Sequence, residues 1–132
     1  MTKLRIKDAA QLLGVSDDTM RRWVDGGALA HEVDDAGRKV VDGKALAEFA
    51  QSQASPIPDP SAVGRSARNR FVGLVTRVVS DTVMSQVELQ CGPFRVVSLI
   101  STEAVHELSL EPGSVAVAVV KATEVIVETP RS

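Results

Sequence analysis

Three prolines near the middle of the chain constrain its architecture more than any other feature. Pro56, Pro58 and Pro60 lie within five residues of one another, among Ser and Ala, in the stretch from Gln51 to Arg65. Alternating Pro favours an extended conformation that acts as a semi-rigid spacer. The 132 residues therefore predict two small domains, residues 1–50 and residues 66–132, joined by a linker at 51–65. Large enzyme folds are excluded.

Charge does not identify a partner by itself. Eight basic and nine acidic residues precede Gln51, and the whole chain has a formal net charge of −2. A DNA or anion site must therefore be local. With three Phe, one Trp and no Tyr, the chain also has too little aromatic surface to stack bases of single-stranded nucleic acid.

The N-terminal half has the apolar spacing of short helices. Ile6 to Leu13 predicts a first helix ending at Gly14, and Ser16 is a typical N-cap for a second helix that ends at Gly26. Trp23 is expected in the core, on the apolar side of that second helix. Two short strands, 31–33 and 38–41, predict a hairpin, and a last helix follows with Leu46 and Phe49.

The C-terminal half has the composition of a small β domain, so the whole chain is predicted to be α+β. Val accounts for 15 of the 65 residues from 66 to 130, and β-branched residues favour strands. Strands are expected at 71–79, 83–91, 94–100 and 114–127, the last of them continuous or broken in two. A short helix is expected at 101–108, with Ala104, Val105 and Leu108 facing inward.

Two short helices joined at a glycine, with arginines on the second, match the design of a helix-turn-helix. The segment resembles the winged helix-turn-helix domains of the MerR and excisionase group, whose pattern it matches at Ala9, Ala10, Leu13, Gly14, Val15, Ser16, Thr19, Arg21, Arg22, Trp23 and Gly27. Arg and Lys there would contact phosphates, while base edges would be read by Asp17, Asp18 or Arg22. The predicted DNA-binding residues are Asp17, Asp18, Thr19, Arg21, Arg22, Arg38 and Lys39. The alternative is that Arg21 and Arg22 form an ordinary solvated helix face.

A second resemblance covers residues 66–127. The Ser66-Ala67-Arg68-Asn69 opening, the Leu110–Gly113 turn and the Lys121-Ala122-Thr123 stretch together resemble the Mop domain of the molbindins, which is of the TOBE type. The resemblance implies an OB-like barrel that binds molybdate or tungstate and oligomerises. It also implies that Ser66, Ala67 and Arg68 reach the anion from one subunit, while Ser101, Lys121 and Ala122 reach it from a neighbour.

The chemistry of these residues agrees with oxyanion binding. Lys121 interrupts an apolar predicted strand and would need a counter-charge or a route to water, which a dianion or solvent would supply. Arg68 is a forked donor, and the hydroxyls of Ser66 and Ser101 donate without adding charge. The alternative is that Lys121 reaches solvent at a strand end. Ala104 and Met84 depart from the family pattern, the former by removing a hydroxyl.

Other functional classes find little support. One Cys and two His allow neither an internal disulfide nor a Cys/His zinc site. No paired carboxylates, Ser/His arrangement or phosphate loop is present, and Cys91 lacks an activating partner, so an enzyme is not expected. The absence of an apolar signal core after Met1 predicts a cytoplasmic location.

These observations predict a transcriptional regulator that binds double-stranded DNA through its N-terminal half. The C-terminal half would bind molybdate or tungstate and form a homo-oligomer, a dimer or a hexamer. Two alternatives remain. One is a molybdate storage or buffering protein, and the other is an oligomeric DNA-binding protein whose Mop domain no longer binds ligand.

Overall fold

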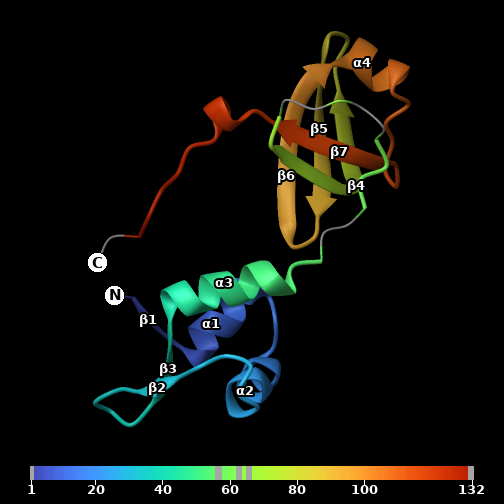
Figure 1. Ribbon diagram of the computed structural model, residues 1–132. Coiled ribbons are helices and arrows are strands. Elements are labelled where there is room, and N and C mark those ends of the chain that lie inside the picture. Colours follow the sequence, from blue (N-terminus) through green and yellow to red (C-terminus); the bar gives the residue numbers. More distant parts are fainter. Residues whose placement is uncertain (1, 56–57, 62–63, 65–66, 131–132) are drawn as a thin grey trace. The chain divides into compact units, whose positions relative to one another are not determined.

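The computed structural model describes residues 2–55, 58–61, 64 and 67–130. The chain separates into two compact units, residues 1–56 and 57–132. One is mainly helical and the other is a β domain with one short helix (Figure 1). The α+β class predicted from the sequence is therefore confirmed.

The N-terminal unit combines three helices with a small sheet. The helices are α1 (Ile6–Leu13), α2 (Asp17–Asp25) and α3 (Gly43–Gln53), and the strands are β1 (Lys3–Arg5), β2 (Glu32–Val33) and β3 (Lys39–Asp42). The antiparallel β2–β3 pair is the predicted hairpin, and β1 joins the other edge of β3 in the order β1-β3-β2. The strand β1 was not predicted, and α3 continues three residues past the predicted domain end at residue 50.

Local capping fixes the ends of these helices. Gly14 ends α1 in the left-handed conformation with a φ of 69°, which a residue without Cβ adopts without steric cost. The Ser16 hydroxyl accepts a hydrogen bond of 3.1 Å from the Thr19 amide at the start of α2. At α3 the Asp42 carboxylate accepts one of 3.1 Å from the Ala45 amide. The predicted glycine stop and serine cap are both confirmed.

A single apolar cluster holds the three helices against β3. Its buried members are Ile6, Ala9, Ala10, Met20, Val24, Leu29, Val41 and Leu46. Trp23 packs against this cluster and meets the Phe49 ring edge-on, with 5.0 Å between ring centroids. The prediction that Trp23 belongs to the core is confirmed.

The C-terminal unit is an antiparallel sheet curled into a half-barrel. Its strands are β4 (Asn69–Ser80), β5 (Met84–Cys91), β6 (Phe94–Ser101) and β7 (Val115–Val120), in the spatial order β6-β5-β4-β7. The helix α4 (Thr102–Glu107) follows β6, and Val105 buries against Val75, Val87, Leu89 and Cys91. Leu108 was expected to face inward but is exposed, because α4 ends before it.

The predicted last strand is too long. β7 ends at Val120, where its pairing with Asn69, the first residue of β4, also ends. A 3-10 turn, η1 (Ala122–Glu124), then leads into a segment that runs away from the sheet (Figure 1). The side chains of Val125, Ile126 and Val127 are 45%, 85% and 87% exposed.

Candidate functional site

The second helix of the N-terminal unit presents the first group of predicted residues. Asp18, Arg21 and Arg22 are exposed on α2. The Arg21 and Asp18 side chains approach to 3.9 Å, and Arg22 donates a hydrogen bond of 3.2 Å to the Thr19 hydroxyl. Asp17, half-buried, occupies the first turn beside them. Five predicted DNA-binding residues therefore share one helix, and four of them contact one another in pairs.

The cations of the hairpin are both paired with acids. Arg38 Nε donates to Asp34 Oδ2 over 3.2 Å, and Lys39 Nζ donates to Asp25 Oδ1 over 2.8 Å. The Asp25 contact joins the hairpin to the end of α2. The hydrogen bond from Lys39 holds the pKa of Asp25 below its usual value, and the backbone amide of Arg38 does the same for Asp34.

Other cations of this unit have no acidic partner. Among residues 2–55, the exposed side chains of Arg5, Lys7, Arg22 and Lys44 form no ion pair. Arg5, Lys7 and Lys44 were not singled out from the sequence, because isolated cations on short elements give no pattern. The positive charge of the unit is thus spread over several elements.

The C-terminal unit brings Arg68 and Lys121 to the same end of the sheet. Asn69 and Val120 are register partners of β4 and β7, and the Asn69 side-chain amide donates to the Val120 carbonyl over 3.1 Å. Arg68 directly precedes Asn69 and Lys121 directly follows Val120, so both cations lie just beyond this last pair, with Ala67 and Ala122 next to them in sequence. Lys121 lies after the strand and is exposed, so the expected cation within an apolar strand is wrong.

No described residue neutralises these two cations. Arg68 is also exposed, and neither side chain forms an ion pair or hydrogen bond with another residue that the structure describes. Ser66, predicted as a third donor here, lies outside the described residues. This end of the β4–β7 pair therefore carries two positive charges that are available to an anion.

Ser101 lies at the opposite end of β4. It is the register partner of Met84, and Ser85 pairs with Ser80 at the far end of β4. Its hydroxyl oxygen accepts a hydrogen bond of 3.0 Å from the Ala104 amide and so caps α4. The hydroxyl hydrogen remains free to be donated. Within one chain the predicted oxyanion residues thus form two separate groups.

A chain of hydroxyls beside Ser101 was missed by the sequence interpretation. The Ser80 and Ser85 hydroxyls are 2.7 Å apart, Ser85 and Thr102 are 2.9 Å apart, and Thr102 donates to the Asp81 carbonyl over 2.9 Å. Ser85 is 1% and Thr102 8% exposed. Because each hydroxyl has a partner, the chain fixes the start of α4, and no spacing rule would have revealed it.

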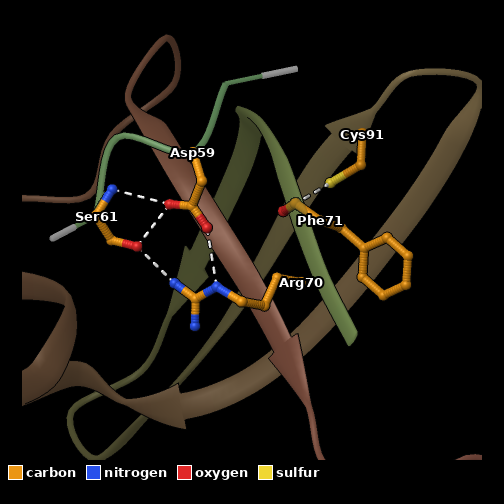
Figure 2. Close-up of polar contacts among 5 residues, drawn as sticks. All are labelled: Asp59, Ser61, Arg70, Phe71 and Cys91. Carbon is orange, nitrogen blue, oxygen red and sulfur yellow. Dashed lines mark hydrogen bonds and ion pairs between the residues drawn. The ribbon is translucent and has the colours of Figure 1, made fainter. Parts of the chain in front are cut away.

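The remaining reactive side chains are structural. Cys91 is buried, which raises the pKa of its thiol, and its sulfur lies 3.6 Å from the Phe71 carbonyl (Figure 2). In the described part of the chain, no cluster of three His, Cys, Asp or Glu side chains has the arrangement of a metal site. Nor does any helix described there have the length and apolar character needed to cross a bilayer.

Comparison with known proteins gives separate matches for the two units. Residues 4–54 match the model of a helix-turn-helix domain, and residues 65–127 match that of a TOBE domain. A probable molybdenum-pterin-binding protein of Haemophilus influenzae is 41% identical over 63 residues, which are 47% of this chain and 91% of that protein. The chain belongs to the TOBE family, and its residues 4–54 form a helix-turn-helix domain.

Further relatives match the TOBE domain. Molybdenum-pterin-binding protein 2 of Clostridium pasteurianum is 36% identical over 63 residues, covering 47% of this chain and 93% of that protein. The molybdate-bound structure of the cytoplasmic molybdate-binding protein ModG is 38% identical, with a TM-score of 0.51, over 55% of this chain and 52% of that chain. The predicted pairing of a helix-turn-helix with a Mop-type domain is confirmed.

Proposed function

We propose that this protein is a transcriptional regulator that binds double-stranded DNA and responds to molybdate or tungstate. The observation that carries the proposal is the presence, in one chain, of a helix-turn-helix domain and a TOBE domain with two unneutralised cations at one end of its sheet. Neither family is known for enzymes, and we propose a non-enzymatic, cytoplasmic protein.

Oxyanion binding would use the two groups of residues from different copies of the chain. Arg68 and Lys121 supply positive charge, and the flanking Ala67 and Ala122 supply backbone N–H donors at the same end of the sheet. Ser101 lies at the opposite end of β4, so its hydroxyl would come from a neighbouring subunit. Charged and neutral donors of this kind suit a tetrahedral dianion.

The half-barrel offers a surface for that neighbour. Strands β6 and β7 are the sheet edges, and a groove of about 480 Å³ lies between them. The side chains of its lining residues are apolar except for Ser98, and they include Val96, Ile100, Leu110 and Val117. Exposed edges readily accept another strand.

We propose that residues 125–127 of a second copy occupy this groove. The segment is apolar, is held away from its own sheet, and would complete the half-barrel as a fifth strand. The resulting homo-oligomer would place the Ser101 group of one copy within reach of the Arg68 group of another. The number of subunits, dimer or hexamer, is set by how many such contacts close.

DNA binding is assigned to α2 and the hairpin, with Arg21 and Arg22 on phosphates or bases and Arg38 and Lys39 on phosphates. Paired acids reduce the charge that a single copy offers, so one domain should bind weakly. Two copies held together by the TOBE domains gain a high effective concentration on adjacent half-sites. Molybdate would act by favouring one arrangement of those copies, since equal affinity for all arrangements shifts nothing.

Calorimetric titration of the full chain with molybdate, tungstate and sulfate tests the anion assignment. We expect molybdate or tungstate to bind, and Lys121→Ala or Arg68→Ala to weaken binding at least tenfold through loss of a charged donor. Lys7→Ala, which removes the same charge from an exposed site of the other domain, should bind like the parent. If Lys121→Ala also binds like the parent, the proposed site is wrong.

Mobility-shift titration with DNA separates the regulator from a storage protein. Arg22→Ala should weaken binding selectively for some sequences, while a paired Arg38→Ala, Lys39→Ala variant should weaken it across all sequences. Anion binding without DNA binding at low salt would favour storage. DNA binding without anion binding would favour the regulator whose TOBE domain has lost its ligand.

A further inference from the structure

The linker contacts the TOBE domain instead of spanning freely to it. Arg70 of β4 donates through Nε to Asp59 Oδ2 over 2.8 Å and through a terminal nitrogen to the Ser61 hydroxyl (Figure 2). The Ser61 amide also donates to Asp59 Oδ1 over 2.8 Å. The Arg70 and Asp59 side chains are 13% and 15% exposed, so this ion pair is well shielded. The same hydrogen bonds lower the pKa of Asp59 far below its usual value.

The contact is next to the end of the sheet that carries Arg68 and Lys121. Arg70 pairs in register with Val119, so it lies two residues from Arg68 and beside the residue two before Lys121. Residues two positions apart along an extended chain are about 7 Å apart. This distance is within one Debye length at physiological salt, about 8 Å. Three cations therefore lie near one another at this end of the sheet, and Asp59 supplies the carboxylate that pairs with one of them.

We propose that docking of the linker through Asp59 and binding of the oxyanion at Arg68 and Lys121 oppose each other. This inference rests on the anion site proposed above and adds how its occupancy would be transmitted. The Asp59 carboxylate lowers the positive potential that the dianion meets, and the bound dianion attracts Arg70 and repels Asp59. Coupling of this kind is reciprocal, so each event weakens the other by the same factor.

Release of the contact would change the reach of the DNA-binding domain. With Asp59 docked, five residues, 54–58, connect α3 to the fixed segment, and an extended chain of that length spans at most about 18 Å. With Asp59 released, the connection runs to residue 68 and its fifteen residues span at most about 54 Å. Anion binding would thus set how far apart two DNA-binding domains reach in one oligomer.

Hydrogen exchange and calorimetry on the full chain test the coupling together. In Asp59→Asn we expect faster exchange without anion at residues 58–61, whose two amide protons are those of positions 59 and 61 because Pro58 and Pro60 have none. We also expect molybdate binding to be tighter by threefold to tenfold. Molybdate should speed exchange at residues 58–61 in the parent and have no such effect in Asp59→Asn. Ser61→Ala, which loosens the contact without changing charge, should speed exchange and tighten binding less. Asp35→Asn, an exposed acid of the hairpin turn, is the matched control.

The outcomes distinguish this inference from the proposed function. If Asp59→Asn leaves exchange at residues 58–61 unchanged, the contact does not hold the linker and the inference is overturned. If the parent binds molybdate but neither exchange nor affinity responds as described, the coupling alone fails. If neither the parent nor Asp59→Asn binds molybdate or tungstate, the anion site fails and the coupling with it, while the exchange data still report whether the linker docks.

Discussion

The two domains differ in how completely each one buries its apolar side chains and pairs its strands. The helix-turn-helix domain encloses a core around Met20 and Val41, both fully buried, and uses β3 as the centre of its sheet. The TOBE domain leaves both edges of its curled sheet open and exposes an apolar segment at residues 125–127. The first has the features of a unit that folds by itself. The second has those of a unit completed by another chain.

The cations of the hairpin and those at the end of the β4–β7 pair differ in the same way. In the helix-turn-helix domain, Arg38 and Lys39 already contact acids of their own domain. In the TOBE domain, Arg68 and Lys121 have no such partner among the described residues, although Arg70 beside them does. A cation without an internal partner is ready for a ligand, whereas a paired one must first exchange its carboxylate.

The largest effect is expected from Ile126→Asp in the exposed segment. Burial of an Ile side chain contributes roughly 1.5–3 kcal/mol, and Asp would leave a charge in an apolar groove. We expect self-association, measured by sedimentation equilibrium, to weaken by at least about 100-fold, the upper end of that range. Leu12→Asp, an equally drastic change at an exposed site of the other domain, should leave it unchanged. An unaltered association constant for Ile126→Asp would show that the TOBE domain is complete without its neighbour.

Gly73→Ala should destabilise the TOBE domain alone. A Cβ at Gly73 would lie 2.5 Å from the Gln90 carbonyl oxygen and 2.6 Å from the Cys91 sulfur, and such overpacking typically costs about 1–3 kcal/mol. Gly37→Ala in the hairpin meets no atom within 4 Å but has a φ of +79°, and its strain is roughly 1 kcal/mol.

Thermal unfolding followed by calorimetry distinguishes the two glycine variants. Gly73→Ala should lower the transition temperature of the TOBE domain, and Gly37→Ala should lower that of the helix-turn-helix domain. Each variant should leave the transition of the other domain as in the parent. If both variants shift both transitions together, the two domains unfold as one unit and neither is independent of the other.

A smaller effect is expected when a paired cation is freed. Asp25→Asn removes the acid that holds Lys39, so Lys39 contacts its phosphate without first giving up a carboxylate that would then take up a cation. We expect DNA affinity to rise by about threefold and the slope of log affinity against log salt to steepen by about one. Asp35→Asn removes the same charge without freeing a cation and should leave the slope unaltered. Weaker binding by Asp25→Asn would mean that the pair positions the hairpin.

The smallest effect concerns acid stability. Amides of Met84 and Val83 hold the pKa of Asp81 below its usual value, as the Arg38 amide does for Asp34. A carboxyl group whose pKa is depressed in the folded state stabilises the fold at pH values above its ordinary pKa of about 3.9. This stabilisation is lost as the pH falls through the pKa of the folded state. Both transitions should therefore fall slightly in temperature between pH 5 and pH 2. Asp81→Asn should reduce the pH dependence of the transition temperature of the TOBE domain alone. An unchanged pH dependence of that transition would contradict the role given to Asp81.

Much of the fold could be predicted because its signals are local. The Gly14 stop, the Ser16 cap and the apolar side of α2 each depend on residues within one or two turns. The three residues of β1 could not be found, since so short a strand exists only by pairing with β3. The end of β7 could not be predicted from the sequence either, because Val125 to Val127 continue its apolar pattern. The strand ends at Val120 because β4 supplies no partner before Asn69.

The features of the candidate site likewise divide into those that the sequence reveals and those that depend on the tertiary structure. The sequence by itself determined which residues are candidates for the site, because Arg68, Lys121 and the arginines of α2 are recognisable from residue type and motif. The tertiary structure decided their surroundings. It paired Lys39 with Asp25 and Arg70 with Asp59, and it placed Ser101 at the opposite end of β4 from Arg68. Contacts between residues distant along the chain depend on how strands align and curl, and no local pattern encodes that alignment.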